Sequence, residues 1–176
     1  MFPVLSAAVL AALAGDPPAA YLSPDGKGLK HPLVFREEQG GFAGTSVLEW
    51  RVEPAGKWTL AKFLVVDGKE RSDTRAATTG TLPAADLAKL ATQLAAERLL
   101  DLPAEMGKPG KVNPHTYKLT FGPKTVTLAG APPRLGEPLK PNLLAAVPES
   151  DPTAAAVRRL AGVAEGLAKL TAAEVK

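Results

Sequence analysis

Apolar and polar residues alternate along the first half of the chain, a period of two that is typical of half-buried β-strands. The alternation runs over residues 33–37, returns over 47–52 and continues over 58–66. A glycine-rich stretch, 38–46, joins the first two segments, and Pro54–Gly56 turns the chain before the third. We therefore predict an antiparallel meander of three strands.

The hydrophobic period changes to that of a helix over residues 82–98. The apolar positions that recur at helical spacing are Leu87, Leu90, Ala91 and Leu94. Pro83 suits the first turn of a helix, where its missing N–H removes no hydrogen bond. The segment before this helix, 67–81, is polar, contains Gly68 and Gly80 and carries charges of both signs, so we interpret it as a solvated loop.

A second group of strands follows a loop that we place at 105–114. The segments 115–121 and 124–128 again alternate, and Gly122 provides the positive φ that a two-residue type II′ turn requires. The pairs that this turn sets are Leu119 with Val126 and Tyr117 with Leu128. All four fall on one side of the hairpin, which supports the predicted register.

A Pro-rich insertion over 129–152 separates this hairpin from a last helix at about 153–170. Gly162 and Gly166, spaced by four in that helix, would let it approach the sheet closely. Residues 32–172 are thus predicted to form one α+β domain. We expect a mainly antiparallel sheet of about five strands in the order βββ-α-ββ-α, with two helices packed on one face.

The first residues have the pattern of a secretory signal peptide, which we place at 1–14. An uncharged apolar run ends there in Ala12-Leu13-Ala14, and it is shorter than the roughly 20 apolar residues that span a bilayer. A buried N-terminal helix is the alternative. With a signal peptide, residues 15–31 would form a flexible leader. The mature protein would then be extracytoplasmic, either periplasmic or secreted, without membrane insertion.

The composition is that of an ordinary globular protein, with 176 residues, 45% hydrophobic and 22% charged, and a net charge of +3. Basic residues are scattered among acidic ones without a long run, so we expect no nucleic-acid partner. The chain has no cysteine. Disulfides, thiolate metal sites and thiol nucleophiles are therefore excluded, and the fold depends on its core.

Residues that carry chemistry are present but not assembled in a known motif. His31 and His115 are far apart, and no histidine pair has the spacing of a metal site. No serine lies in a nucleophile motif. Glu37 and Glu38 would point to opposite faces of a strand, so they cannot share a proton. We expect no catalytic residues, no metal, no cofactor and hence no enzyme.

The stretch EQGGFAGTS, residues 38–46, places an aromatic residue among three glycines. In one interpretation Phe42 plugs a small core, and the glycines are present for positive φ in the strand connection. In the other, Phe42 is an exposed apolar tip that enters a pocket of another protein. The partner-binding residues would then be those of the turn, namely Gly40, Gly41, Phe42, Ala43 and Gly44.

The segment Val34–Gly44, VFREEQGGFAG, is similar to the opening strand and GGFAG-type turn of emfourin-like proteins. These are small bacterial inhibitors of thermolysin-like (M4 family) metalloproteases. The helix predicted at 82–94, the strand pattern Tyr117–Phe121 and the closing helix at 153–170 follow in the order of that family. The resemblance covers roughly residues 32–170.

The resemblance implies an inhibitor that acts on a secreted metalloprotease by surface complementarity. Thermolysin-like enzymes favour bulky apolar side chains beside the scissile bond, which Phe42 on its glycine turn could supply, and nearby loops could instead seal the cleft. Because the chain has no cysteine and only isolated histidines, strong chelation of the zinc is not expected. The rival hypotheses are an extracytoplasmic binding or envelope-associated protein without a protease target, and an undetected enzyme.

Overall fold

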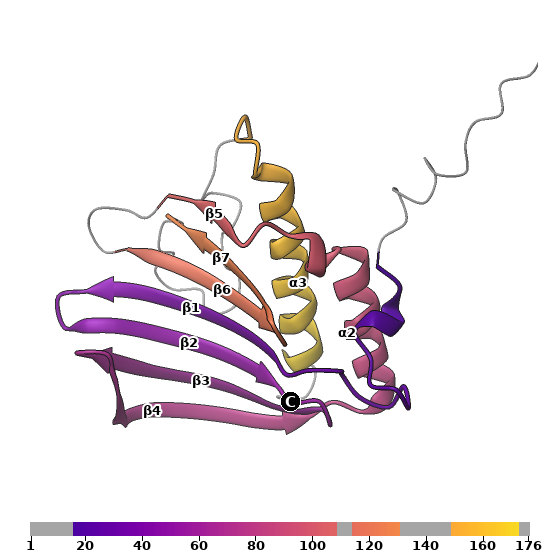
Figure 1. Cartoon of the computed structure of the whole chain (residues 1–176). Helices are drawn as coiled ribbons and strands as arrows, with labels where there is room; N and C mark the ends of the chain where they lie inside the picture. Colours follow the sequence, from indigo (N-terminus) through magenta and orange to yellow (C-terminus); the bar gives the residue numbers. More distant parts are fainter. Residues whose placement is uncertain (1–15, 109–113, 131–148, 173–176) are drawn as a thin grey trace, which may run out of the picture.

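The computed structural model describes residues 16–108, 114–130 and 149–172. The predicted signal peptide and most of the Pro-rich insertion at 129–152 lie outside these residues. Figure 1 shows one sheet and the two helices that pack on it. The strands are β1 (Leu33–Gly41), β2 (Gly44–Val52), β3 (Lys57–Val66), β4 (Lys69–Thr81), β5 (Glu105–Gly107), β6 (His115–Phe121) and β7 (Lys124–Ala129). The helices are α2 (Ala84–Ala96) and α3 (Ala154–Ala172), with short 3₁₀ turns η1 (Pro18–Ala20) and η2 (Leu99–Asp101).

The strands of the described residues form one 7-stranded sheet in the order β4-β3-β2-β1-β6-β7-β5. Neighbouring strands are antiparallel except β5 and β7, which run parallel, so the sheet is mixed. The domain is α+β as expected. The prediction of about five strands in the order βββ-α-ββ-α is wrong, because the described residues form seven strands in the order ββββ-α-βββ-α.

Strand β4 is absent from the sequence prediction because neither of its faces is buried. Thr74 and Gly80 are half-buried and every other residue of β4 is exposed, so the strand shows no hydrophobic alternation. The turn before it has a clear signature, since Asp67 and Gly68 have φ values of 50° and 73°, as a type I′ hairpin requires. The loop predicted over 67–81 is therefore a tight turn followed by an edge strand.

Strand β5 is the second strand that the sequence prediction lacks. It is three residues long and pairs with β7 through Met106 opposite Leu128. Met106 is buried, whereas Glu105 and Gly107 are exposed. Three residues are too few to establish a period of two, so the segment was expected to be part of a loop over 105–114.

The main core lies between the helices and one face of the sheet. Phe35 is the register partner of both Trp50 and Leu119, and all three are buried. The pairs predicted for the second hairpin, Leu119 with Val126 and Tyr117 with Leu128, are confirmed. The residues that α2 buries are Leu87, Leu90, Ala91, Leu94 and Ala95, the first four as predicted.

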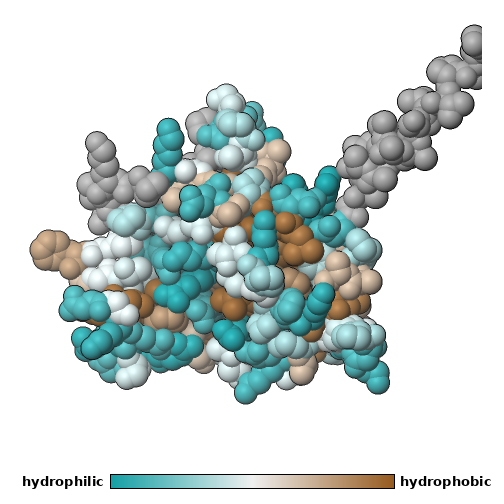
Figure 2. All heavy atoms as spheres, in the orientation of Figure 1, coloured by the Kyte–Doolittle hydropathy of each residue, from teal (hydrophilic) through white to brown (hydrophobic). Residues whose placement is uncertain are grey.

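The opposite face of the sheet carries a smaller cluster formed by Val47, Ala61 and Phe63. The guanidinium of Arg75 lies 4.9 Å from the centroid of the Phe63 ring, and that of Arg36 lies 5.6 Å from it. Such cation–π contacts place a guanidinium over an apolar ring, and that of Arg36 also pairs with the carboxylates of Glu38 and Glu49. Figure 2 shows hydrophobic residues in small separate groups among hydrophilic ones on the face that it presents.

The segment predicted as a flexible leader, 15–31, packs against the sheet in its described part. Tyr21 and Leu29 are buried and belong to the main core. The Tyr21 hydroxyl donates a hydrogen bond to Asp16 Oδ2 at 2.7 Å, and the Tyr21 ring lies 5.5 Å from that of Phe121. Burial, together with the hydrogen bond to Asp16, raises the pKa of this hydroxyl. The leader is therefore part of the folded domain from Tyr21 onward, and this prediction needs correction.

The two glycines of α3 face α2. A Cβ at Gly162 would collide with the carboxylate of Glu97, and a Cβ at Gly166 would lie 3.0 Å from Gln93 Cγ. The Gln93 side-chain amide donates to the Gly162 carbonyl at 3.4 Å. The two glycines thus allow α3 and α2 to approach each other. The prediction that these glycines let α3 approach the sheet is wrong.

Glu97, at the end of α2, is half-buried against α3. Burial raises the pKa of its carboxyl group, the positive charge of Arg159 opposes this shift, and the negative charge of Glu165 adds to it. A raised pKa means that the folded protein binds the proton more tightly than the unfolded chain. The contribution of this group to stability is therefore fully present below its ordinary pKa of 4.5 and is lost as the pH rises through the raised pKa.

Glu97→Gln is expected to remove this pH dependence, because the amide fills the same space without a titrating charge. Urea unfolding of both proteins from about pH 4 to about pH 8 should show the variant gaining stability relative to the wild type as the pH rises. Parallel stability profiles of the two proteins would contradict the prediction.

Candidate functional site

The turn between β1 and β2 lies at the end of the sheet away from both helices (Figure 1). Gly41 is the register partner of Gly44, which leaves the two-residue turn Phe42–Ala43. Phe42 is 112% exposed, and the next most exposed large apolar side chain of the described residues, Leu100, is 38% exposed. At the left edge of Figure 2, hydrophobic atoms project where Figure 1 places this turn. The interpretation of Phe42 as a core plug is therefore wrong, and Phe42 is an exposed tip.

Gly44 gives the turn its geometry. Neither Phe42 nor Ala43 has a positive φ, so this is not one of the primed turns that match the twist of paired strands. Gly44 has a φ of +118°, and a Cβ there would lie 2.5 Å from the carbonyl oxygen of Val65. The strand can continue from the turn only because this residue has no side chain.

The other two glycines differ in the space around them. A Cβ at Gly40 would lie 2.8 Å from Pro114 Cδ, so the missing side chain makes room for the proline ring. At Gly41 the nearest group is the Gly44 carbonyl oxygen at 3.5 Å, which is ordinary van der Waals contact. The five residues predicted as a binding site thus lie together on one hairpin, and Gly40 and Gly44 are needed for its structure.

A buried polar contact below the turn was not predicted from the sequence. His115 Nε2 lies 2.7 Å from Glu37 Oε1, and the Tyr117 hydroxyl donates to the same oxygen at 3.5 Å. The side chain of His115 is 2% exposed, and its Nδ1 has no hydrogen-bond partner among the described residues. Glu37 and His115 are 78 positions apart and meet only because β1 pairs with β6, so no local pattern indicated the contact.

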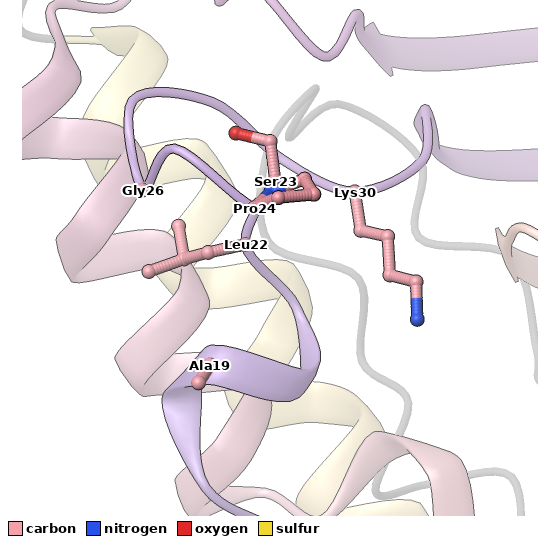
Figure 3. Close-up of a pocket in the computed structure, with 6 residues that line it drawn as sticks. All are labelled: Ala19, Leu22, Ser23, Pro24, Gly26 and Lys30. Carbon is pink, nitrogen blue, oxygen red and sulfur yellow. The ribbon is translucent and has the colours of Figure 1, made fainter.

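A hollow of about 380 Å³ lies on the segment before β1 (Figure 3). Its lining residues are Ala19, Leu22, Ser23, Pro24, Gly26 and Lys30. The side chains of Leu22, Ser23 and Lys30 point in different directions. Ser23 Oγ donates to Asp25 Oδ1 at 2.6 Å and accepts from the Gly28 N–H at 3.0 Å. The hollow therefore lacks the converging acid, base and nucleophile that an active site needs.

Two further features are missing from the part of the chain that the structure describes. No group of three or more His, Cys, Asp or Glu residues there could hold a metal ion. No helix there is both long and apolar enough to cross a bilayer. Among the described residues, the exposed turn is therefore the strongest candidate for a binding site.

Comparison with known proteins does not assign the chain to a family. No protein-family model matches the sequence, and no curated protein matches it at a significant level. The function is therefore argued from the turn and from the residues that hold it.

Gly44→Ala is expected to lower the free energy of unfolding by about 1–3 kcal/mol, because alanine would take an unfavourable φ and its Cβ would meet the Val65 carbonyl. Gly41→Ala is the matched control, since its methyl group would meet only the Gly44 carbonyl oxygen, at an ordinary van der Waals distance of 3.5 Å, and we expect a change within about 0.5 kcal/mol. Urea unfolding measures both variants. Equal stabilities would show that the backbone at residue 44 does not require glycine.

Proposed function

We propose that this protein is an exported, non-enzymatic inhibitor of thermolysin-like metalloproteases that acts by surface complementarity. The observation that carries the proposal is Phe42, fully exposed on a two-residue turn between two paired strands. The similarity of Val34–Gly44 to the opening strand and turn of emfourin-like proteins supplies the class of target.

Phe42 has the properties of an anchor residue. Transfer of a phenylalanine side chain from water to an apolar pocket contributes about 1.5–3 kcal/mol. A mobile loop would lose part of this gain when binding orders its backbone, but both arms of this hairpin are already paired within the sheet. Thermolysin-like enzymes favour bulky apolar side chains beside the scissile bond, so their substrate pocket suits this residue.

The rest of the interface would come from neighbouring turns. Protease–inhibitor interfaces usually bury about 800 Å² on each partner, more than one side chain provides. The β3–β4 turn, Asp67–Gly68, lies at the same end of the sheet as Phe42 (Figure 1). A protease that binds Phe42 in its substrate pocket would contact this second turn at the rim of its active-site cleft. Filling of the pocket by Phe42 and sealing of the cleft by the second turn would then both contribute to inhibition.

The proposal includes export, because a secreted metalloprotease is a target only for a protein that leaves the cytoplasm. Its support is the sequence pattern of residues 1–14, with the uncharged apolar run and Ala12-Leu13-Ala14. These residues lie outside the described part of the chain. The site of action would be the periplasm or the medium.

A second candidate is an extracytoplasmic binding or envelope-associated protein with another partner. The same observation favours it, since an exposed phenylalanine on a fixed turn fits an apolar pocket in many proteins. The two candidates differ in the identity of the partner, which an inhibition titration against a panel of metalloproteases determines.

Phe42→Ala is expected to weaken inhibition of a thermolysin-like protease by about 10- to 150-fold, the equivalent of the apolar transfer energy that is lost. Its free energy of unfolding should stay within about 0.5 kcal/mol of the wild type, because the exposed side chain packs against nothing. Phe42→Leu keeps a bulky apolar group and should retain most of the inhibition. The measurement is a titration of protease activity on a peptide substrate.

Leu100→Ala is the matched control, since it removes the next most exposed apolar side chain, and it should inhibit like the wild type. Unchanged inhibition by Phe42→Ala would exclude the Phe42 side chain from the contact. A wild-type chain that inhibits none of the metalloproteases in the panel would reject the inhibitor and favour the second candidate.

A further inference from the structure

An exposed aromatic residue at a loop tip is usually easy to cleave, because loop tips are preferred sites of proteolysis. A protease binds its substrate in an extended conformation, so the peptide bonds beside Phe42 can be cut only if the turn opens. We propose that Pro114 and His115, at the start of β6, clamp the end of β1 and hold the turn closed. Phe42 can then enter an apolar pocket without its own peptide bonds being cut. The identity of the partner rests on the proposed function, whereas the clamp does not.

The first contact of the clamp joins Gly40 to Pro114. The Gly40 N–H donates to the Pro114 carbonyl oxygen at 2.8 Å, which continues the pairing of β1 and β6 beyond its last register pair, Gln39 with His115. The proline ring occupies the space where a side chain at residue 40 would stand, with Cδ 2.8 Å and Cγ 2.9 Å from that Cβ position. The ring can pack there only because residue 40 is glycine.

The second contact joins the side chains of Glu37 and His115. Their atoms Oε1 and Nε2 lie 2.7 Å apart, and the His115 ring centroid lies 4.8 Å from that of Tyr117. Because the His115 side chain is almost fully buried, separating β1 from β6 at this point would expose the ring and break its contact with Glu37. Opening the arm of the hairpin that precedes Phe42 therefore has an added free-energy cost.

The other arm of the hairpin is held by β3. Thr45 is the register partner of Val65, and the backbone of Gly44 lies against the Val65 carbonyl. Only the three residues Gly41–Ala43 lie between the held positions on the two arms. Any longer extended segment requires the loss of contacts with β6 or β3.

Chymotrypsin, which has a hydrophobic pocket for the residue before the scissile bond, tests the clamp on the full chain. We expect the Phe42–Ala43 bond of the wild type to resist cleavage, with fragment masses identifying the bond that is cut. In Gly40→Ala the added methyl group displaces the Pro114 ring, and this bond should be cut about tenfold faster, since cleavage follows the population of the open turn. Leu100→Ala, a substitution outside the hairpin, should leave the cleavage of this bond at the wild-type rate.

Pro114→Ala removes the ring without adding a clash and should also be cut about tenfold faster. If Gly40→Ala does not fold, Pro114→Ala alone tests the clamp. The urea midpoint of each variant separates local opening of the turn from global unfolding. Rapid cleavage of the wild-type turn, resistance of the clamp variants, or a rate increase fully explained by a lower urea midpoint would each overturn the clamp.

A thermolysin-like protease in place of chymotrypsin separates the clamp from the proposed function. If both hold, Gly40→Ala and Pro114→Ala should change from inhibitor to substrate, with the cut beside Phe42. A chymotrypsin result that supports the clamp, together with a wild-type chain that inhibits no metalloprotease, would reject the proposed function and leave the clamp in place.

Discussion

The pairing of β1 with β6 joins the two halves of this protein. On one side β1 continues the N-terminal strands β2, β3 and β4, and on the other it meets the C-terminal hairpin. The register runs from Leu33 opposite Phe121 to Gln39 opposite His115, between segments about 80 residues apart in sequence. Closing so long a loop costs conformational entropy, which is offset by the apolar face that the united sheet presents to both helices.

The same pairing determines the environment of the β1–β2 turn. It brings Pro114 to Gly40 and His115 to Glu37, so a turn that would be free in an isolated hairpin is held at its base. Phe42 lies beyond these contacts and is left out of the core. The Phe42 side chain makes no core contact, and the backbone on both sides of it is paired within the sheet, so Phe42 is suited to a role in binding.

The two edges of the sheet are protected in different ways. Strand β5 offers only three residues to another strand. Strand β4 is much longer, but its first half carries charged side chains and a shift in register opposite Lys62 and Leu64, where Thr74 Oγ1 accepts the Leu64 N–H at 2.9 Å. Charges and irregularities of this kind disfavour edge-to-edge association. Edge-to-edge association is therefore disfavoured along β5 and along the first half of β4.

The sequence by itself determined the elements that have one buried face, because a one-sided core leaves a period of two in a strand and of 3.6 in a helix. These elements include α2, α3 and the hairpin that pairs Leu119 with Val126. Tertiary structure alone decided whether Phe42 is a plug or a tip, since the same glycine turn suits both and the outcome depends on whether another segment covers it. Tertiary structure also decided that residues 69–81 form a strand, because a strand that is exposed on both faces has no hydrophobic period. It decided the contact between Glu37 and His115 as well, because contacts between distant segments leave no local pattern.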